Sequence, residues 1–276
     1  MPKKLLMLTT CIVNEENIQD LLRMVRSYRD DFSNCIHLIL LQGDLSNFKS
    51  VISALELSTH IISVPNIISL SKARNIMFEY AMSSGFLDLC EVIAFPDDDC
   101  WYPDNNLTDI FTLFEKNTAL DLLVCRYSES TQSLHQSKGQ NLSLKQLVSY
   151  GSSATLFTRV SCLDKKNFFD ESLGIGSPNN GGEDLDFALR VFKKSRHGIF
   201  FDHPLVGHSD KVVSKNYRYF QGSFRALRKN LFLHPLIPLF FIRKFLVGIY
   251  YVLRFGMPLS KFFSSSQKLK GLSNEK

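Results

Sequence analysis

The sequence lacks the cysteine patterns of disulfide-bonded or zinc-binding proteins. Its six cysteines are scattered, with mostly apolar neighbours and no Cys-x-x-Cys pair. Such a distribution predicts reduced, buried thiols in a cytosolic compartment. A secretory leader is not expected either, because Thr9, Thr10 and Asn14 interrupt the first apolar stretch and no small-residue cleavage pattern follows. We predict a strand in that stretch instead.

The sequence also lacks an apolar run long enough for a transmembrane helix. Residues 231–242 and 245–253 are apolar stretches near the C-terminus, and Arg243 and Lys244 separate them. Both fall short of the roughly 20 residues that a bilayer-spanning helix needs. Prolines in this part predict that it is divided into short pieces. They are Pro235, Pro238 and Pro258.

Acidic residues are missing from most of the C-terminal part. Residues 1–210 hold 19 Lys and Arg against 26 Asp and Glu, whereas residues 211–274 hold 12 basic residues and no acidic one. A basic, aromatic-rich amphipathic segment is typical of a helix that lies in the membrane interface. We therefore predict that residues 221–276 bind an anionic membrane surface. A helical hairpin that packs on the core or forms a dimer is the alternative, whereas nucleic-acid binding would need no such apolar stretches.

The rest of the chain alternates short apolar runs with helical patterns, as a parallel sheet with crossover helices requires. With 276 residues, 45% of them hydrophobic, the chain can form a large core. We predict an α/β fold at residues 1–220, with a mostly parallel, Rossmann-like sheet and helices on both faces. A basic, amphipathic helical appendage follows at residues 221–276. The predicted strands are residues 5–12, 35–41, 60–64, 92–95, 122–125, 154–158 and 198–201.

Three consecutive carboxylates follow the predicted strand at residues 92–95, and they are Asp97, Asp98 and Asp99. Ligands bind just beyond the carboxyl ends of strands in open parallel sheets. Because crowded like charges repel one another, a divalent cation with a preference for oxygen ligands would stabilise them. The alternative is an acidic helix N-terminus, since Asp and Asn residues are also typical caps for a helix that begins near Leu107.

A second acidic motif consists of Gly181 and Gly182 followed by Glu183 and Asp184. The glycines allow close approach of a ligand or a metal, although acidic residues in a first helical turn stabilise any helix. The third element is His208, which follows the predicted strand at residues 198–201. A lone histidine is more often structural than a ligand, so each of these signals is weak by itself.

The order of the three motifs resembles that of the GT-A fold glycosyltransferases, particularly glycosyltransferase family 2. The resemblance covers roughly residues 5–210. Asp97–Asp99 match the D-x-D motif of that family, and Glu183–Asp184 match its E-D motif. Residues 70–75, Leu-Ser-Lys-Ala-Arg-Asn, are similar to the family's L-S-x-A-R-N segment, which lines the donor site.

The resemblance implies a role for particular side chains. Asp97, Asp99 and His208 would hold a divalent metal, Mn2+ or Mg2+. Asp184 would be the catalytic base, with Glu183 as the alternative, because sequence does not separate adjacent carboxylates. The residues expected to bind the nucleotide sugar are Cys11, Asn14, Asp44, Ser71, Arg74, Asp97 and Asp98. The residues expected to bind the acceptor are Trp101, Ser153, Gly182 and Glu183.

The implied activity is inverting transfer of a sugar from a nucleotide-diphosphate donor to a hydroxyl of a glycan or a lipid-linked glycan. We expect it to serve surface polysaccharide synthesis, with the protein bound peripherally at the cytoplasmic face of the inner membrane. A sugar nucleotidyltransferase is one alternative, but residues 9–16 lack the Gly-rich phosphate loop and basic residue that it would normally have. The other is a non-catalytic carbohydrate- or membrane-binding protein, which would not need Glu183 and Asp184 after two glycines.

Overall fold

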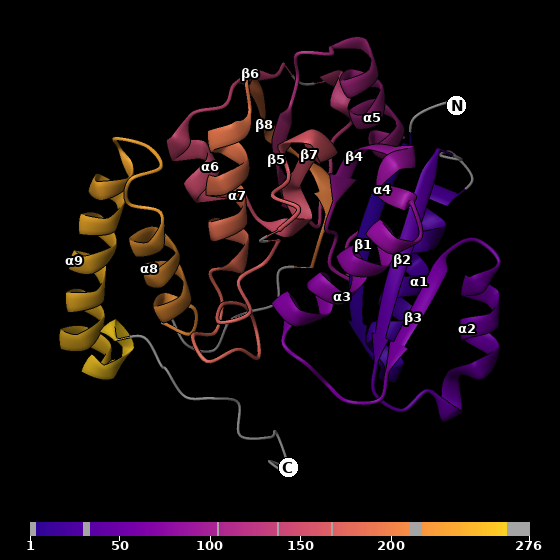
Figure 1. Ribbon diagram of the computed structural model, residues 1–276, viewed down its shortest axis with the longest axis horizontal. Coiled ribbons are helices and arrows are strands. Elements are labelled where there is room, and N and C mark those ends of the chain that lie inside the picture. Colours follow the sequence, from indigo (N-terminus) through magenta and orange to yellow (C-terminus); the bar gives the residue numbers. More distant parts are fainter. Residues whose placement is uncertain are drawn as a thin grey trace.

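The computed structural model describes residues 4–29, 34–103, 105–136, 138–166, 168–209 and 217–263. These residues form an eight-stranded sheet of order β3-β2-β1-β4-β7-β5-β8-β6 (Figure 1). The strands are β1 (Lys4–Ile12), β2 (Cys35–Gln42), β3 (His60–Val64), β4 (Cys90–Ala94), β5 (Leu122–Ser128), β6 (Gln140–Asn141), β7 (Leu156–Arg159) and β8 (Gly198–Gly207). The helices are α1 (Glu15–Arg29), α2 (Lys49–Glu56), α3 (Leu70–Ser83), α4 (Phe86–Leu89), α5 (Asn106–Lys116), α6 (Leu144–Tyr150), α7 (Glu183–Lys194), α8 (Phe220–Lys229) and α9 (Ile237–Phe255).

The sheet is mostly parallel, which confirms the predicted fold class. Strand β1 pairs in parallel with β2 and β4, β2 with β3, and β5 with β8. Strand β7 is antiparallel to both of its neighbours, β4 and β5, and β6 is antiparallel to β8. Because β7 reverses direction between them, β4, β5 and β8 all run the same way. Their carboxyl ends therefore meet at one edge of the sheet.

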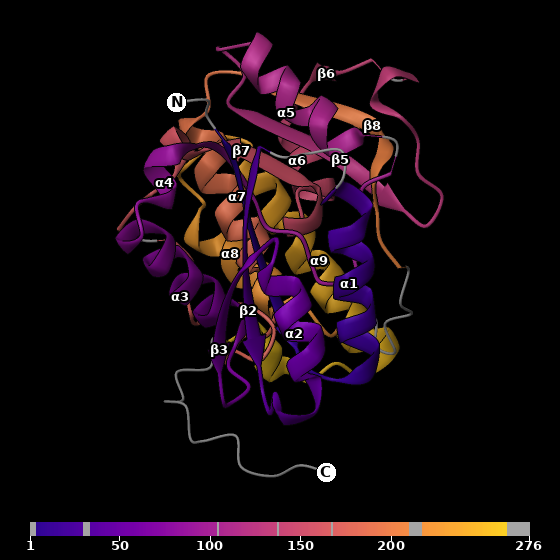
Figure 2. The same cartoon turned by 90° about the vertical axis from the view of Figure 1, so that its right-hand side faces the viewer.

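Helices cover both faces of the sheet, and each face has its own apolar core (Figures 1 and 2). Successive residues of a strand point to opposite faces. Leu6 and Leu8 of β1 accordingly pack with buried residues of α3, α4, α6 and α7. Leu5 and Met7 pack with buried residues of α1, α2 and α5.

Helices α8 and α9 form an additional layer outside α7 (Figure 1). Asp186 of α7 is buried and accepts hydrogen bonds from Nε of Arg190 at 3.0 Å and from Nδ2 of Asn230 at 2.9 Å. Nζ of Lys229 lies 3.2 Å from the same carboxylate. Since Lys229 and Asn230 are at the end of α8, this buried carboxylate holds α8 against α7. Helix α8 begins at Phe220, and the division of the chain into two domains at this point stays a prediction.

The predicted division of the C-terminal part by prolines is wrong at Pro238. Helix α9 runs unbroken for 19 residues, and Pro238 lies in its first turn. A proline is tolerated there because the N–H that it lacks would have no partner within the helix. Gly256, with a φ of 64°, ends the helix. Among the residues described, no helix combines the length and the apolar character needed to cross a membrane.

The predicted strand at residues 154–158 is displaced in the structure. Residues 153–155 form a 3₁₀ turn, and β7 begins only at Leu156. The side chains of Ser152 and Thr155 form a capping box around this turn. Local side-chain to backbone hydrogen bonds of this kind compete with strand pairing.

The loop after β4 is tied to the end of β8. Backbone hydrogen bonds of 2.9 and 2.8 Å connect Trp101 and Gly207 in both directions. A Cβ atom on Gly207 would overlap the indole ring of Trp101, so position 207 requires a glycine. This bridge places the acidic loop beside His208, the residue that follows Gly207.

Candidate active site

Arg74 connects the two acidic motifs. Its side chain is 2% exposed, its Nη1 donates to Oδ1 of Asp184 at 2.7 Å, and its Nη2 lies 3.5 Å from Oδ1 of Asp97. The guanidinium carbon is 5.1 Å from the ring centroid of Phe169 and 6.0 Å from that of Phe95. A guanidinium withdrawn from water needs carboxylates around it. Arg74 therefore fixes the acidic motif after β4 next to the start of α7.

The carboxylate of Asp97 is crowded by like charges. Although 39% of its side-chain surface is exposed, withdrawal from bulk water raises the pKa of Asp97 to about 6. Arg74 and His208 oppose this shift, whereas Asp184 and Asp99 add to it. A cation among these carboxylates would reduce their repulsion.

His208 lies beside the same carboxylates. Its Nε2 is 3.2 Å from Oδ1 of Asp99 and 3.9 Å from Oδ2 of Asp97. Its Nδ1 is buried and has no hydrogen-bond partner in the part of the chain that the structure describes. Two carboxylates and an imidazole make a donor set that suits Mn2+ or Mg2+.

Cys100 is the other potential ligand in this group. Three potential ligand atoms lie within 4.8 Å of one another, one each from Asp99, Cys100 and His208. Burial raises the pKa of the Cys100 thiol well above its ordinary value, and Asp97 and Asp99 raise it further. A protonated thiol is a poor partner for a hard cation. The oxygen and imidazole donors are therefore the better ligands.

The three aspartates are not the N-cap of α5. Helix α5 begins at Asn106 with Asn105 as its N-cap. The Trp101–Gly207 bridge lies between the acidic loop and that helix. Asp97, Asp98 and Asp99 instead lie in the turn after β4.

The Gly-Gly-Glu-Asp motif forms the start of α7. Gly181 and Gly182 have positive φ angles of 87° and 84°. A Cβ atom on Gly182 would overlap the backbone of Gly222, so the motif also allows close contact with α8. The side chain of Glu183 is 6% exposed. Burial, and after it the charge of Asp184, raises the pKa of Glu183 to about 7.

A cavity of about 830 Å³ opens over these groups. Asp97, Glu183, Asp184 and His208 all line it. They come from three distant segments of the chain, as the sequence motifs predicted for one shared site. The volume is in the range of small-molecule sites, which are typically 300–1,000 Å³.

Cys11 and Ser71, which were also predicted to bind the nucleotide sugar, are buried like Arg74. Cys11 lies beside Asp98, and burial together with that carboxylate raises the pKa of the Cys11 thiol well above its ordinary value. The hydroxyl of Ser71 donates to the carbonyl oxygen of Leu173 at 2.7 Å. Ser71 thus supports the glycine-containing loop ahead of α7.

Asn14 and Asp44, from the same predicted set, are exposed and shape local turns. Oδ1 of Asn14 accepts a hydrogen bond from the backbone N–H of Asn17 at 2.8 Å, at the start of α1. Asp44 accepts from the backbone N–H and the hydroxyl of Ser46 at 2.9 and 3.0 Å, and these bonds lower the pKa of Asp44. Neither lines the cavity, and their roles with the nucleotide stay predictions.

The residues predicted to bind the acceptor are divided between the cavity and its surroundings. Gly182 and Glu183 line it. The hydroxyl of Ser153 lies 3.5 Å from Oδ1 of Asp97. Trp101 is not among the lining residues, and its ring packs on Gly207 and lies 4.5 Å from the guanidinium carbon of Arg23.

One wall of the cavity is formed by residues that sequence analysis assigned to the membrane-binding appendage. Arg243 and Lys244 of α9 line it, as does Ser223 of α8, and Tyr219 just before α8 adds to the same wall. In the sequence, the signal that could have indicated this wall is the basic pair between two apolar runs. The direction in which this pair points depends on the packing of α9 on α8, which sequence does not give.

The fold and the convergence of both acidic motifs on one cavity define a glycosyltransferase of the GT-A type. The model of glycosyl transferase family 2 matches residues 9–176, which is more than half of the chain. The chain therefore belongs to glycosyltransferase family 2. No curated protein matches the sequence at a significant level.

Solved structures share this fold at low sequence identity. The structure of S. aureus TarS 1–349 in complex with UDP-GlcNAc has a TM-score of 0.70 and 14% identity over 94% of this chain and 78% of that one. Another S. aureus TarS structure has a TM-score of 0.69 and 14% identity, over 94% of this chain and 46% of that one. GalNAc-T7 with UDP, GalNAc and Mn2+ has a TM-score of 0.54 and 12% identity, over 82% and 48%. In a further TarS 1–349 structure the match spans 64% of that chain, less than two thirds of its length.

The buried carboxylate of Glu183 should make stability depend on pH. Its pKa is about 7 in the folded chain against an ordinary value of 4.5. The folded state thus holds this proton more tightly, so the free energy of unfolding falls as pH rises between these values. Replacement of Glu183 by Gln should raise the melting temperature at pH 8, measured with a chelator present, by roughly 2–4 °C for each kcal/mol regained. The gain should be smaller at pH 5.

A Glu56→Gln variant is the control, because Glu56 is exposed on α2. It should show the same melting temperature as the parent protein at both pH values. Equal melting temperatures for Glu183→Gln and the parent at pH 8 would mean that ionisation of Glu183 does not lower the free energy of unfolding.

Proposed function

We propose that this protein is a metal-dependent, inverting glycosyltransferase that moves a sugar from a nucleotide-diphosphate sugar to a hydroxyl of a glycan or a lipid-linked glycan. The observation that carries the proposal is the contact of one buried guanidinium, that of Arg74, with Asp97 and Asp184 in a single cavity. A UDP-sugar is the donor that we favour, since similar folds are known with UDP-GlcNAc and with UDP.

The donor's two phosphates need positive charge around them. Asp97, Asp99 and His208 would hold Mn2+ or Mg2+, and the structure of GalNAc-T7, which has a similar fold, contains Mn2+. Such a cation, when bound, stabilises the negative charge that develops on the leaving diphosphate. Arg74 neutralises Asp97 and Asp184 from the protein side and keeps both in place.

Asp184 is the base that we favour. In the transfer, the acceptor oxygen forms a bond to the anomeric carbon while the bond from that carbon to the phosphate oxygen breaks. The proton of the acceptor hydroxyl passes to the carboxylate of Asp184, and the nucleoside diphosphate leaves. Direct displacement of this kind inverts the configuration at the anomeric carbon. Asp184 is 27% exposed to the cavity, whereas Glu183 is 6% exposed, so Asp184 is the easier carboxylate for an acceptor to reach.

We also propose that α9 attaches the enzyme to an anionic membrane surface, at the cytoplasmic face of the inner membrane. The support is a row of exposed apolar side chains at spacings of three and four residues, which places them on one face of the helix. They are Leu239, Ile242, Leu246, Ile249 and Leu253. Basic residues beside such a row favour anionic lipid.

The metal assignment is tested with the Asp99→Asn and His208→Gln variants and UDP as the probe. We expect Mn2+-dependent UDP binding, measured by calorimetry, to weaken at least tenfold. Even outer-shell changes at metal sites cost about 10–100-fold. Asp88→Asn, on the exposed side of α4, is the charge-matched control and should bind UDP normally. Unchanged Mn2+-dependent affinity in both site variants would rule out the metal role.

The base assignment is tested with Asp184→Asn. Asparagine keeps an oxygen for the hydrogen bond from Arg74 but does not accept the proton. Turnover should fall by about 10²–10⁴-fold, while the affinity for UDP with Mn2+ stays close to that of the parent. Glu183→Gln should retain most of its activity. The reverse result, an active Asp184→Asn enzyme and an inactive Glu183→Gln enzyme, would identify Glu183 as the base.

The membrane proposal is tested by sedimentation with vesicles that contain phosphatidylglycerol. The Leu246→Asp/Leu253→Asp double variant should lose vesicle binding, because both side chains belong to the exposed row. Leu57→Asp, at a position that is 80% exposed just after α2, is the matched control and should still bind. Retained binding by the double variant would refute attachment through α9. Point variants are preferable to deletion, since Ile237 of α9 belongs to the main core.

A further inference from the structure

The lining of the catalytic cavity includes two basic side chains of α9 that the proposed chemistry does not use. Arg243 and Lys244 are neighbours on α9, and both line the cavity that holds Asp97 and Asp184. In the part of the chain that the structure describes, neither of them forms an ion pair with a carboxylate. Two adjacent cations without an anionic partner repel each other.

Lys244 is held in an environment that disfavours its charge. It is half-buried, and its Nζ lies 5.4 Å from the centroid of the Phe220 ring, which gives a cation–π contact. Burial, together with the charge of Arg243, lowers the pKa of Lys244. An anion between the two side chains would remove this penalty, because an opposite charge favours the ionised form.

Asp97 and Asp184, which line the same cavity, do not fill this need. Asp97 and Asp184 are already paired with Arg74. The cavity lining therefore combines carboxylates that are paired with Arg74 and, on α9, two cations without an ion pair among the described residues. A ligand that complements both groups has a hydroxyl for Asp184 and an anionic group for Arg243 and Lys244.

The donor is a poor candidate for that anionic group. Of the residues predicted to bind the nucleotide sugar, Asp97 lines this cavity, and it lies in the loop after β4. Those that are not among its lining residues are Cys11, Asn14, Asp44, Ser71, Arg74 and Asp98. The residues that would hold the metal for the diphosphate are Asp97 and Asp99 in the loop after β4 and His208 just after β8. The α8–α9 side is thus left for the acceptor.

We propose that the acceptor carries a phosphate or a similar anionic group close to the hydroxyl that receives the sugar, and that Arg243 and Lys244 bind this group. The proposal rests on the proposed function, because it takes the cavity to be the transfer site. Phosphate suits the pair well, since it offers several strong acceptor oxygens and carries nearly two charges at neutral pH. A guanidinium and an ammonium side by side then contribute charge-assisted hydrogen bonds.

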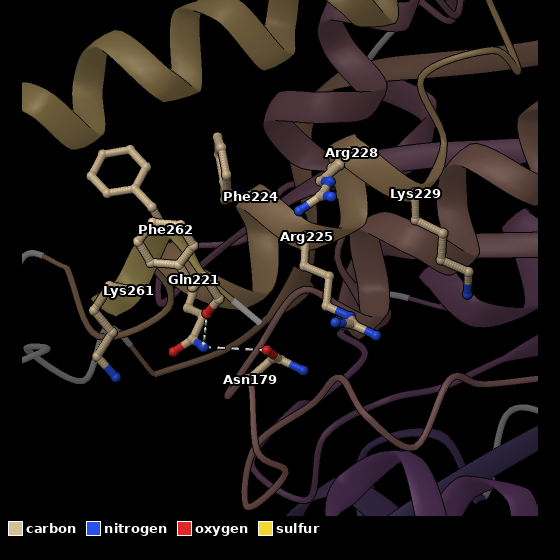
Figure 3. A pocket seen from close by; sticks show the side chains of 9 residues that line it. Asn179, Gln221, Phe224, Arg225, Arg228, Lys229, Lys261 and Phe262 are labelled. Carbon is tan, nitrogen blue, oxygen red and sulfur yellow. Dashed lines mark hydrogen bonds between the residues drawn. The ribbon is translucent and has the colours of Figure 1, made fainter. Parts of the chain in front are cut away.

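A separate cavity of about 290 Å³, which basic side chains line, provides a matched control (Figure 3). Arg225 and Arg228 of α8 line it together with Lys261, and Gln221 hydrogen-bonds with Asn179 at 3.3 Å (Figure 3). The residues described as lining it include no carboxylate. The Arg225→Gln/Lys261→Gln double variant removes two charges, as does Arg243→Gln/Lys244→Gln, but outside the catalytic cavity.

Glycerol 3-phosphate and glycerol are the probes, titrated by saturation-transfer NMR on the full chain with UDP and Mg2+ present. The parent enzyme should bind glycerol 3-phosphate in preference to glycerol. The Arg243→Gln/Lys244→Gln variant should lose at least about tenfold in affinity for glycerol 3-phosphate, as expected for lost charge-assisted hydrogen bonds. Its affinity for UDP with Mg2+ should not change, and the Arg225→Gln/Lys261→Gln control should match the parent in both titrations.

Three results would overturn the proposal. The first is equal binding of glycerol and glycerol 3-phosphate by the parent, which would indicate a neutral acceptor. The second is an equal loss of phosphate affinity in the control variant, which would indicate nonspecific attraction. The third is a parallel loss of UDP affinity in the Arg243→Gln/Lys244→Gln variant, which would assign the cations to the donor. Arg243→Gln alone, at an exposed position, keeps the test valid if the double variant unfolds.

The source of the phosphate is separated by competition. Displacement of glycerol 3-phosphate by phosphatidylglycerol vesicles would assign the anionic group to a lipid, and lack of displacement would assign it to a soluble glycan. Both results support an anionic acceptor. Failure of the proposed function is distinct, because it would appear as unchanged Mn2+-dependent UDP affinity in the Asp99→Asn and His208→Gln variants.

Discussion

The ion pairs of Arg74 are the constraint on which the site depends. This guanidinium is 2% exposed and lies between carboxylates that are far apart in the chain. Breaking a buried pair leaves a charge without compensation, which is strongly unfavourable. The loop after β4 and the start of α7 must therefore stay together. The contact of Arg74 with both carboxylates therefore also fixes the position of the cavity that they line.

The same arrangement explains why the cavity is lined by charges of both signs. Arg74 compensates the carboxylates but does not neutralise all of them, and the pKa values of Asp97 and Glu183 are raised to about 6 and about 7. Arg243 and Lys244, which line the same cavity from α9, come from a segment with no acidic residue of its own. A fold that keeps such charges in one cavity is suited to bind a ligand with complementary charges.

Much of the fold and part of the site were predictable from local patterns. Strand β3 has the bounds that its apolar run predicts, and the acidic motif at Asp97–Asp99 does follow a buried strand. Other features escaped prediction because local sequence is ambiguous. Pro238 reads as a helix breaker, yet it occupies the first turn of α9, where it is tolerated. Ser152 and Thr155 turn the chain by their own hydrogen bonds where an apolar run predicts a strand.

The sequence alone determined the order of the motifs, the two-sided apolar strands and the separation of acidic from basic segments, because these follow from periodicity and composition. Only the tertiary structure decided which charges meet. The position of Arg74 between Asp97 and Asp184 depends on how α3 and α7 pack on the sheet. The direction of Arg243 and Lys244 depends on how α9 packs on α8, since a helix exposes all its faces until a neighbour covers one.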